Sequence, residues 1–184
     1  MTRASDSKPG RGLSLIGYRG TGKTTVGRLV AGRLGLPFLD ADAELERLAG
    51  RPISEIFASN GEGYFRDLEG HTLQALTAGP PVVLATGGGA ILRESNRRAL
   101  RRFGVVVWLT AGADALVDRL RHAPGNRPAL TAAGLLAEIA GVLAARAPLY
   151  EEAADAVVAT EGRGIVEVAD AILIASARCR EPSR

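Results

Sequence analysis

The chain has little cysteine and no long apolar stretch. A single cysteine among 184 residues, Cys179, cannot form a disulfide within the chain, so we expect a reducing compartment. No apolar run approaches the roughly 18 residues that a membrane-spanning helix needs. Residues 1–12 lack the apolar centre of a secretory signal. These absences predict a cytoplasmic protein without a membrane segment.

Lysine is also scarce. Of the 23 positively charged side chains only Lys8 and Lys23 are lysines, and the others are arginines. An isolated arginine is therefore weak evidence for function in this chain, whereas a lysine kept at one position is stronger evidence. The net charge is +3, but no dense basic run is interleaved with aromatic residues, so we expect no nucleic-acid partner. The sequence has no conspicuous coiled-coil or apolar surface pattern that would indicate a protein partner, and we expect a monomer.

Apolar runs alternate along the chain with stretches of helical periodicity. They predict buried strands at residues 13–16, 37–40, 82–85, 105–109 and 156–158. Helices are predicted at residues 23–34, 43–49, 53–59, 62–76, 94–102, 113–121, 135–147 and 164–177. Continuous apolar strands that alternate with helices indicate a parallel sheet covered on both faces. We therefore expect an α/β fold with three α/β/α layers and a five-stranded parallel sheet.

The chain offers no internal repeat and no linker that would divide it. We predict one domain at residues 12–178, between disordered tails at 1–11 and 179–184. A stretch that contains proline and glycine, at about 121–131, is predicted to form a mobile lid.

A glycine-rich loop at residues 17–24 fits the pattern G-x-x-x-x-G-K-T and stands between the first predicted strand and the first predicted helix. This context makes it a phosphate-binding loop, because its backbone N–H groups and the helix N-terminus face phosphate oxygens. Lys23 would neutralise the β and γ phosphates, and the Thr24 hydroxyl would ligate Mg²⁺. The predicted nucleotide contacts of the loop are Gly20, Thr21, Gly22, Lys23, Thr24 and Thr25.

The loop alone does not name a reaction, because GTPases, ATPases and small kinases all use it. The chain has no N-K-x-D guanine reader, and it is far shorter than a helicase. A small-molecule kinase is the interpretation that these features favour.

Two carboxylates, Asp40 and Asp42, lie at the end of the second predicted strand. Alternate residues of a strand point to the same side, so both can face a site at the carboxyl edge of the sheet. One could hold the Mg²⁺ shell, and the other could orient and deprotonate an acceptor hydroxyl. Asp42 could instead cap the helix that follows. Residues 87–89, three glycines after the third strand, could expose backbone N–H groups to a small ligand or form a plain turn.

Three arginines are candidates for binding anions. Arg127, inside the predicted lid, could swing over the transferred phosphoryl group. Arg66 and Arg146 could together select an acidic acceptor, because guanidinium groups bind carboxylates through two parallel bonds. Each of the three could also be an ordinary surface arginine in this arginine-rich chain.

Taken in order, these motifs resemble the shikimate kinase family. The resemblance runs from Leu13 to about Ala177 and rests on the phosphate loop followed by F-L-D-A-D at 38–42, Y-F-R at 64–66, G-G-G at 87–89, N-R-P-A-L at 126–130 and R-A-P-L-Y at 146–150. It implies a P-loop kinase fold and transfer of the γ-phosphoryl group of ATP to the 3-hydroxyl of shikimate.

The resemblance also implies a role for each matching residue. Lys23 and Thr24 would hold phosphates and Mg²⁺, with Asp40 in the outer metal shell. Asp42 would bind shikimate hydroxyls and act as the base. The shikimate contacts would be Arg66, Arg146 and the backbones of Gly88 and Gly89. The remaining nucleotide contacts would be Arg127, Arg163 and, against adenine, Arg121 or Arg119.

Two alternatives remain at this stage. The chain could be another P-loop metabolite kinase, such as a gluconate-type kinase. It could also be a kinase-like domain that serves as an effector-binding regulatory module.

Overall fold

The computed structural model describes residues 12–121 and 132–180 of the chain. Its strands are β1 (Gly12–Ile16), β2 (Phe38–Asp40), β3 (Val83–Ala85), β4 (Gly104–Thr110) and β5 (Ala156–Ala159). Its helices are α1 (Lys23–Leu34), α2 (Ala41–Ala49), α3 (Ile53–Ala78), α4 (Glu94–Phe103), α5 (Ala113–Arg121), α6 (Ala132–Ala153) and α7 (Ile165–Arg180), with a short 3-10 helix, η1, at Ala90–Leu92. The predicted lid, including Arg127, lies mostly outside the described residues, as do the two predicted tails.

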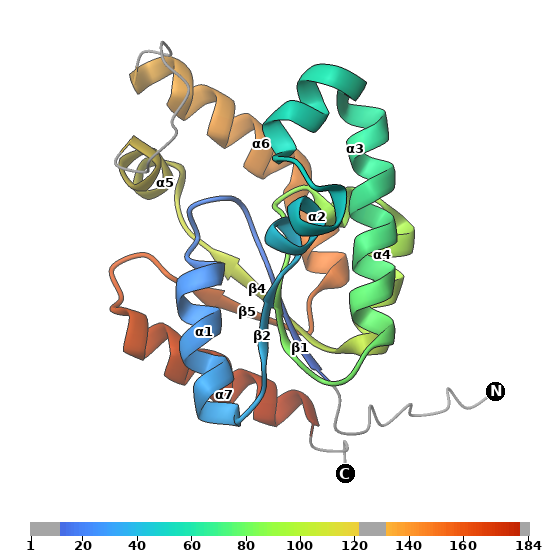
Figure 1. Ribbon diagram of the computed structural model, residues 1–184. Coiled ribbons are helices and arrows are strands. Elements are labelled where there is room, and N and C mark those ends of the chain that lie inside the picture. Colours follow the sequence, from blue (N-terminus) through green and yellow to red (C-terminus); the bar gives the residue numbers. More distant parts are fainter. Residues whose placement is uncertain (1–11, 122–131, 181–184) are drawn as a thin grey trace, which may run out of the picture.

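The five strands form one parallel sheet in the order β2-β3-β1-β4-β5 (Figure 1). The predicted five-stranded parallel sheet is therefore confirmed. β1 lies at its centre, and its residues are fully buried, which explains why an unbroken apolar run predicted it. Strand β1 pairs with β3 on one side and with β4 on the other, and β2 and β5 form the two edges of the sheet. The chain reverses its direction of winding at β1, where an open α/β sheet binds ligands.

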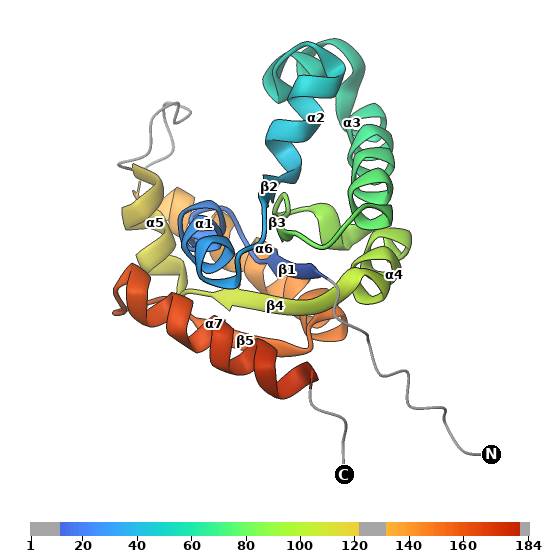
Figure 2. The same ribbon diagram turned by 60° about the horizontal axis from the view of Figure 1, so that its bottom comes forward.

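Helices cover both faces of the sheet, as the sequence predicts (Figure 2). On one face, α1 and α7 bury Val26, Val30 and Ile172 against side chains of β1, β3 and β4. On the other face, α3, α4 and α6 bury Leu73, Leu100 and other apolar residues. Burial of apolar area is the main source of stability, at about 25 cal/mol for each Å² removed from water. The sheet therefore holds the ends of its strands in fixed relative positions.

Helix α6 differs from the prediction, which ended it at Ala147 before a proline. The helix continues through Pro148 to Ala153. Proline removes one backbone hydrogen bond of a helix, but the residues beyond it are tied down by packing. Tyr150 and Ala153 are each 1% exposed and belong to the core under the sheet. Tertiary burial outweighs the local signal here.

Helix α3 contains a break where two helices were predicted. Gly61 adopts φ 78° and ψ 177°, which is not helical, and the helix resumes at the next residue. A positive φ of this kind is accessible to glycine at little steric cost. No helix in the described part of the chain combines the length and the apolar character needed to cross a membrane.

Candidate active site

The phosphate loop lies at the carboxyl end of β1 and leads into α1. Gly22 caps that helix with φ 89°, a left-handed conformation that favours glycine. A side chain on Gly17 would meet the carbonyl oxygen of Leu109 at 2.4 Å, so the loop packs directly on β4. Gly20, Gly22, Lys23, Thr24 and Thr25 line a cavity of about 400 Å³. We call this the loop cavity.

Thr21 has a different place from the other predicted loop residues. Its side chain is 1% exposed, and its hydroxyl donates to the carbonyl of Tyr18 at 2.8 Å. Thr21 therefore fixes the shape of the loop with its side chain, and a contact with a nucleotide would come from its backbone.

Lys23 bends back over the loop. Its Nζ donates to the carbonyl oxygens of Gly17, at 2.8 Å, and Tyr18, at 2.9 Å. Burial lowers the pKa of Lys23 to about 8, and the charges of Asp42 and Asp40 partly oppose this effect. The hydrogen-bond partners of this buried ammonium are uncharged carbonyl groups, so a bound anion would stabilise its charge. Lys23 is therefore well placed to bind a phosphate.

Asp40 joins the loop to the start of α2. It accepts a hydrogen bond from the Thr24 hydroxyl at 2.7 Å through Oδ2. Its other oxygen accepts from the backbone N–H of Asp42, at 3.1 Å, and of Ala43. Asp40 is thus the N-cap of α2. A hydroxyl and a carboxylate held side by side are the oxygen donors that Mg²⁺ prefers.

The prediction that Asp40 and Asp42 share a strand is wrong. Asp40 is the last residue of β2, and Asp42 lies in the first turn of α2. The structure also removes the alternative that Asp42 caps the helix, because Asp40 does so. Asp42 therefore does not cap α2, and it lines both the loop cavity and the cavity beside it.

The environment of Asp42 disfavours its charge. Burial, then the neighbouring negative charges of Asp40 and Glu69, raise the pKa of Asp42 from 3.8 to about 6, against the opposing effect of Lys23. A carboxylate with a raised pKa in a cleft is a candidate general base, because it takes up a proton near neutral pH.

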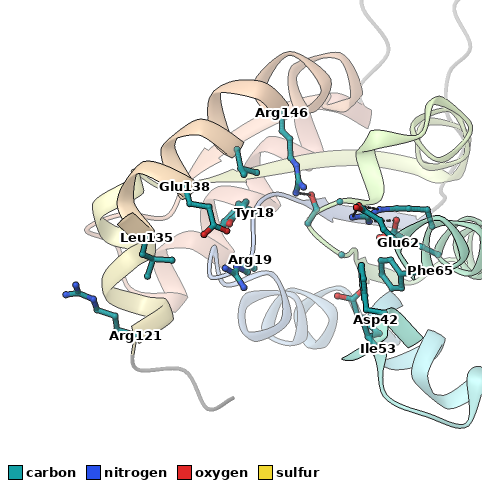
Figure 3. A pocket seen from close by; sticks show the side chains of 17 residues that line it. Tyr18, Arg19, Asp42, Ile53, Glu62, Phe65, Arg121, Leu135, Glu138 and Arg146 are labelled. Carbon is teal, nitrogen blue, oxygen red and sulfur yellow. Dashed lines mark hydrogen bonds and ion pairs between the residues drawn. The ribbon is translucent and has the colours of Figure 1, made fainter. Parts of the chain in front are cut away.

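The second cavity, of about 790 Å³, lies between α3, α6 and the glycine segment 87–89. We call it the acceptor cavity. Figure 3 shows Asp42, Phe65 and Glu62 at one end and Arg121 and Glu138 at the other. Arg19, which no motif had singled out, stands in the wall between the two cavities and lines both.

The glycines at 87–89 make room for charged side chains of the protein itself. A Cβ on Gly87 would lie 2.6 Å from Oδ1 of Asp42 and 3.0 Å from Oε1 of Glu69. A Cβ on Gly89 would lie 2.3 Å from Nη1 of Arg66. The sequence suggested that these glycines admit a ligand, and the structure adds that they admit the residues that would hold one.

Arg146 and Tyr150, one turn apart on α6, reach the same glycine segment from the other side. Nη1 of Arg146 and the Tyr150 hydroxyl both donate to the carbonyl of Gly88, at 3.2 and 2.6 Å. The Tyr150 ring is stacked on Trp108, with ring centroids 5.3 Å apart. Burial raises the pKa of Tyr150 to about 12, so its hydroxyl stays a donor. The predicted pair, Arg66 and Arg146, is therefore brought to adjacent glycines.

Besides Arg19, sequence reasoning assigned no role to Glu69 or Tyr150. Glu69 is 5% exposed and binds Arg66 Nη1 through Oε2 at 2.8 Å. Tyr150 supports Gly88 from below. Their positions three residues after Arg66 and four after Arg146 were visible in the sequence, and residues at this spacing share one face of a helix.

A family model described as shikimate kinase matches residues 19–176. The chain belongs to the shikimate kinase family. The shikimate kinase of Ruegeria pomeroyi is 45% identical over 163 residues, which cover 89% of this chain and 83% of that protein. That of Symbiobacterium thermophilum is 44% identical over 162 residues, with 88% and 93% covered. The predicted family and its ATP-dependent kinase activity are confirmed.

Solved structures agree with this family assignment. The shikimate kinase of Acinetobacter baumannii, solved in complex with shikimate, has a TM-score of 0.82 and 38% identity, covering 90% of this chain and 92% of that one. A gluconokinase from Sinorhizobium meliloti reaches a TM-score of 0.55 at 20% identity, so it shares the fold alone. The gluconate-type alternative has no further support.

Two arginines, Arg119 and Arg121, are candidates for the adenine contact that the resemblance to shikimate kinases implies. Arg119 donates to the carbonyl of Gly20 at 3.1 Å and to the hydroxyl and carbonyl of Thr160 at 3.0 Å each. Arg121 is exposed and lines the far end of the acceptor cavity. Arg163 is exposed in the turn before α7 and lines neither of the two described cavities. Arg119 therefore contacts the phosphate loop, whereas Arg121 lines the acceptor cavity.

Proposed function

We propose that the loop cavity and the acceptor cavity form one transfer site. In it, the γ-phosphoryl group of ATP passes to the 3-hydroxyl of shikimate to give shikimate 3-phosphate and ADP. The observation that carries the proposal is the place of Asp42, which lines both cavities and lies between the phosphate loop and the pair Arg66 and Arg146. The complex of the A. baumannii relative with shikimate supports the choice of acceptor.

The chemical step needs a base and positive charge. The acceptor oxygen forms a bond to the γ phosphorus while the bond from that phosphorus to the β–γ bridging oxygen breaks. Asp42 takes the hydroxyl proton as the new bond forms. Lys23 offsets the charge that spreads over the equatorial oxygens, and Arg127 of the predicted lid would assist it.

Thr24 and Asp40 would hold the Mg²⁺ ion, with the Thr24 hydroxyl as a ligand and Asp40 in the outer shell. The hydrogen bond of 2.7 Å from the Thr24 hydroxyl to Oδ2 of Asp40 supports this role, because it holds the two oxygen atoms side by side at the phosphate loop. When bound, the ion would screen the charge of the phosphates.

The acceptor would be held by Asp42 at its hydroxyls and by Arg66 and Arg146 at its carboxylate, with the backbones of Gly88 and Gly89 alongside. ATP would contact Gly20, Thr21, Gly22, Lys23, Thr24 and Thr25, together with Arg127, Arg163 and Arg121 or Arg119. We propose further that the kinase acts as a monomer in the cytoplasm, with ATP and shikimate as its partners.

Turnover of ATP with shikimate, quinate and gluconate as separate acceptors tests this proposal. Shikimate is expected to give the highest kcat/KM, because it matches both the carboxylate pair and the hydroxyl contacts of Asp42. The same ATP turnover with and without all three acceptors would refute the transfer to shikimate.

A further inference from the structure

The guanidinium of Arg66 is held by two carboxylates of its own helix. Nε and Nη2 donate to Oε1 of Glu62, at 3.2 and 3.1 Å, and Nη1 donates to Oε2 of Glu69 at 2.8 Å. The side chain of Arg66 is 15% exposed, and it also lies over the ring of Phe65. Its orientation is therefore fixed before any ligand arrives.

A count of donors shows what remains for a ligand. A guanidinium has five N–H groups, one on Nε and two on each terminal nitrogen. The three bonds to Glu62 and Glu69 use one N–H on each of the three nitrogens. One N–H is left on Nη1 and one on Nη2, and a carboxylate is a strong acceptor for both. Both terminal nitrogens lie against the backbone of Gly89.

Glu62 and Glu69 differ in how firmly the fold holds them. Glu69 is 5% exposed, whereas the side chain of Glu62 is 64% exposed and pairs with Arg66 at the spacing i, i+4. An exposed pair of this kind contributes little to stability. The break at Gly61 places Glu62 at the restart of α3, one helical turn before Arg66. Glu62 thus sits where it can orient Arg66 without being needed for the core.

Net charge does not explain how the cavity would attract an acid. The charged side chains that line the acceptor cavity among the described residues are Arg19, Arg66, Arg121 and Arg146 against Asp42, Glu62, Glu69 and Glu138. The two signs balance formally, so an acidic acceptor depends on local geometry rather than on a positive field.

We propose that Glu62 is a positioning residue for the carboxylate of the acceptor. By occupying Nε and one N–H of Nη2, it turns the guanidinium of Arg66 so that the two remaining N–H groups are available beside Gly89. This inference rests on the proposed acceptor function of the same cavity. It makes Glu62 a residue on which the preference for an acidic acceptor over its uncharged ester depends.

The test compares Glu62→Gln with the unaltered enzyme, using shikimate and its methyl ester as acceptors. Glutamine keeps the shape but weakens the charge-assisted bonds, so KM for shikimate should rise about tenfold while kcat and KM for ATP stay within about twofold. The preference for the acid over the ester should fall by a similar factor. In an Arg66→Met background, the same change at Glu62 should have no further effect on that preference.

A matched control is Glu94→Gln, which breaks an i, i+4 pair with Arg98 on α4, away from the cavity. It should leave all four quantities unchanged. An acid-to-ester preference that Glu62→Gln leaves intact would overturn the inference, and so would a lower KM for shikimate, which would make Glu62 a competitor of the acceptor. An unaltered enzyme that does not phosphorylate shikimate would instead overturn the proposed function, and this inference with it.

Discussion

Replacement of Asp42 by asparagine is expected to stabilise the fold while it removes most of the activity. The carboxylate is held in surroundings that raise its pKa from 3.8 to about 6. Each unit of difference between the folded and unfolded pKa corresponds to about 1.4 kcal/mol, so ionised Asp42 lowers the free energy of unfolding by about 3 kcal/mol at neutral pH. Asparagine keeps the shape and removes this cost.

The sign of the pH dependence follows from the direction of the shift. Because the folded pKa lies above the unfolded value, the protonated form is favoured by folding, and stability is lost as pH rises from about 4 to about 6. The advantage of Asp42→Asn should be largest at pH 7.5 and about 1.5 kcal/mol smaller at pH 5. Below pH 4 the two proteins should be equally stable in this respect.

Urea denaturation at pH 5 and pH 7.5 measures the difference in free energy of unfolding, and steady-state kinetics at pH 7.5 measures kcat. We expect kcat to fall a hundredfold or more, because the proton of the acceptor hydroxyl loses its base. A variant that is no more stable than the unaltered protein at pH 7.5 would refute the electrostatic argument. A near-normal kcat would refute the role of base.

Three further outcomes are expected. ATP binding should take up protons near pH 8.5, because the phosphates raise the lowered pKa of Lys23; equal calorimetric enthalpies in two buffers of different ionisation enthalpy would contradict this. Gly89→Ala should raise KM for shikimate and spare KM for ATP, since its Cβ would displace Nη1 of Arg66; an unchanged KM for shikimate would exclude the contact. Arg146→Ala should weaken acceptor binding by about 1.5–3 kcal/mol while ATP binding survives, and unchanged shikimate kinetics would rule out this role.

Local signals in the sequence were sufficient where they coincide with the caps of helices. The bounds predicted for α1, residues 23–34, are those observed, because Gly22 and Gly35 flank the apolar pattern and both adopt left-handed conformations. The break in α3 was also predicted, as the gap between residues 59 and 62. At each of these three positions a glycine adopts a backbone conformation that other residues rarely adopt.

The finer features of the site depend on contacts between distant segments. The sequence shows Asp40 and Asp42 as equivalent, and the division of labour between them depends on where β2 ends, which is fixed by its pairing with β3. The spacing places Glu69 on the same face of α3 as Arg66, but its position against Gly87 depends on α3 lying beside the glycine segment. The predicted helix stopped before Pro148 because proline is a local helix breaker. The burial of Tyr150, which favours continuing the helix, appears only in the folded core.

Lys23 and Asp42 link the two halves of the site electrostatically. Burial moves their pKa values toward each other, to about 8 and about 6, while each charge favours the ionised form of the other. The negative charge of a bound triphosphate acts on both groups in the same direction and raises both pKa values. Lys23 then holds its proton more firmly, and Asp42 becomes a stronger base. The nucleotide would therefore improve both the cation proposed to bind its phosphates and the base proposed to activate the acceptor, while ionised Asp42 stays costly to the fold.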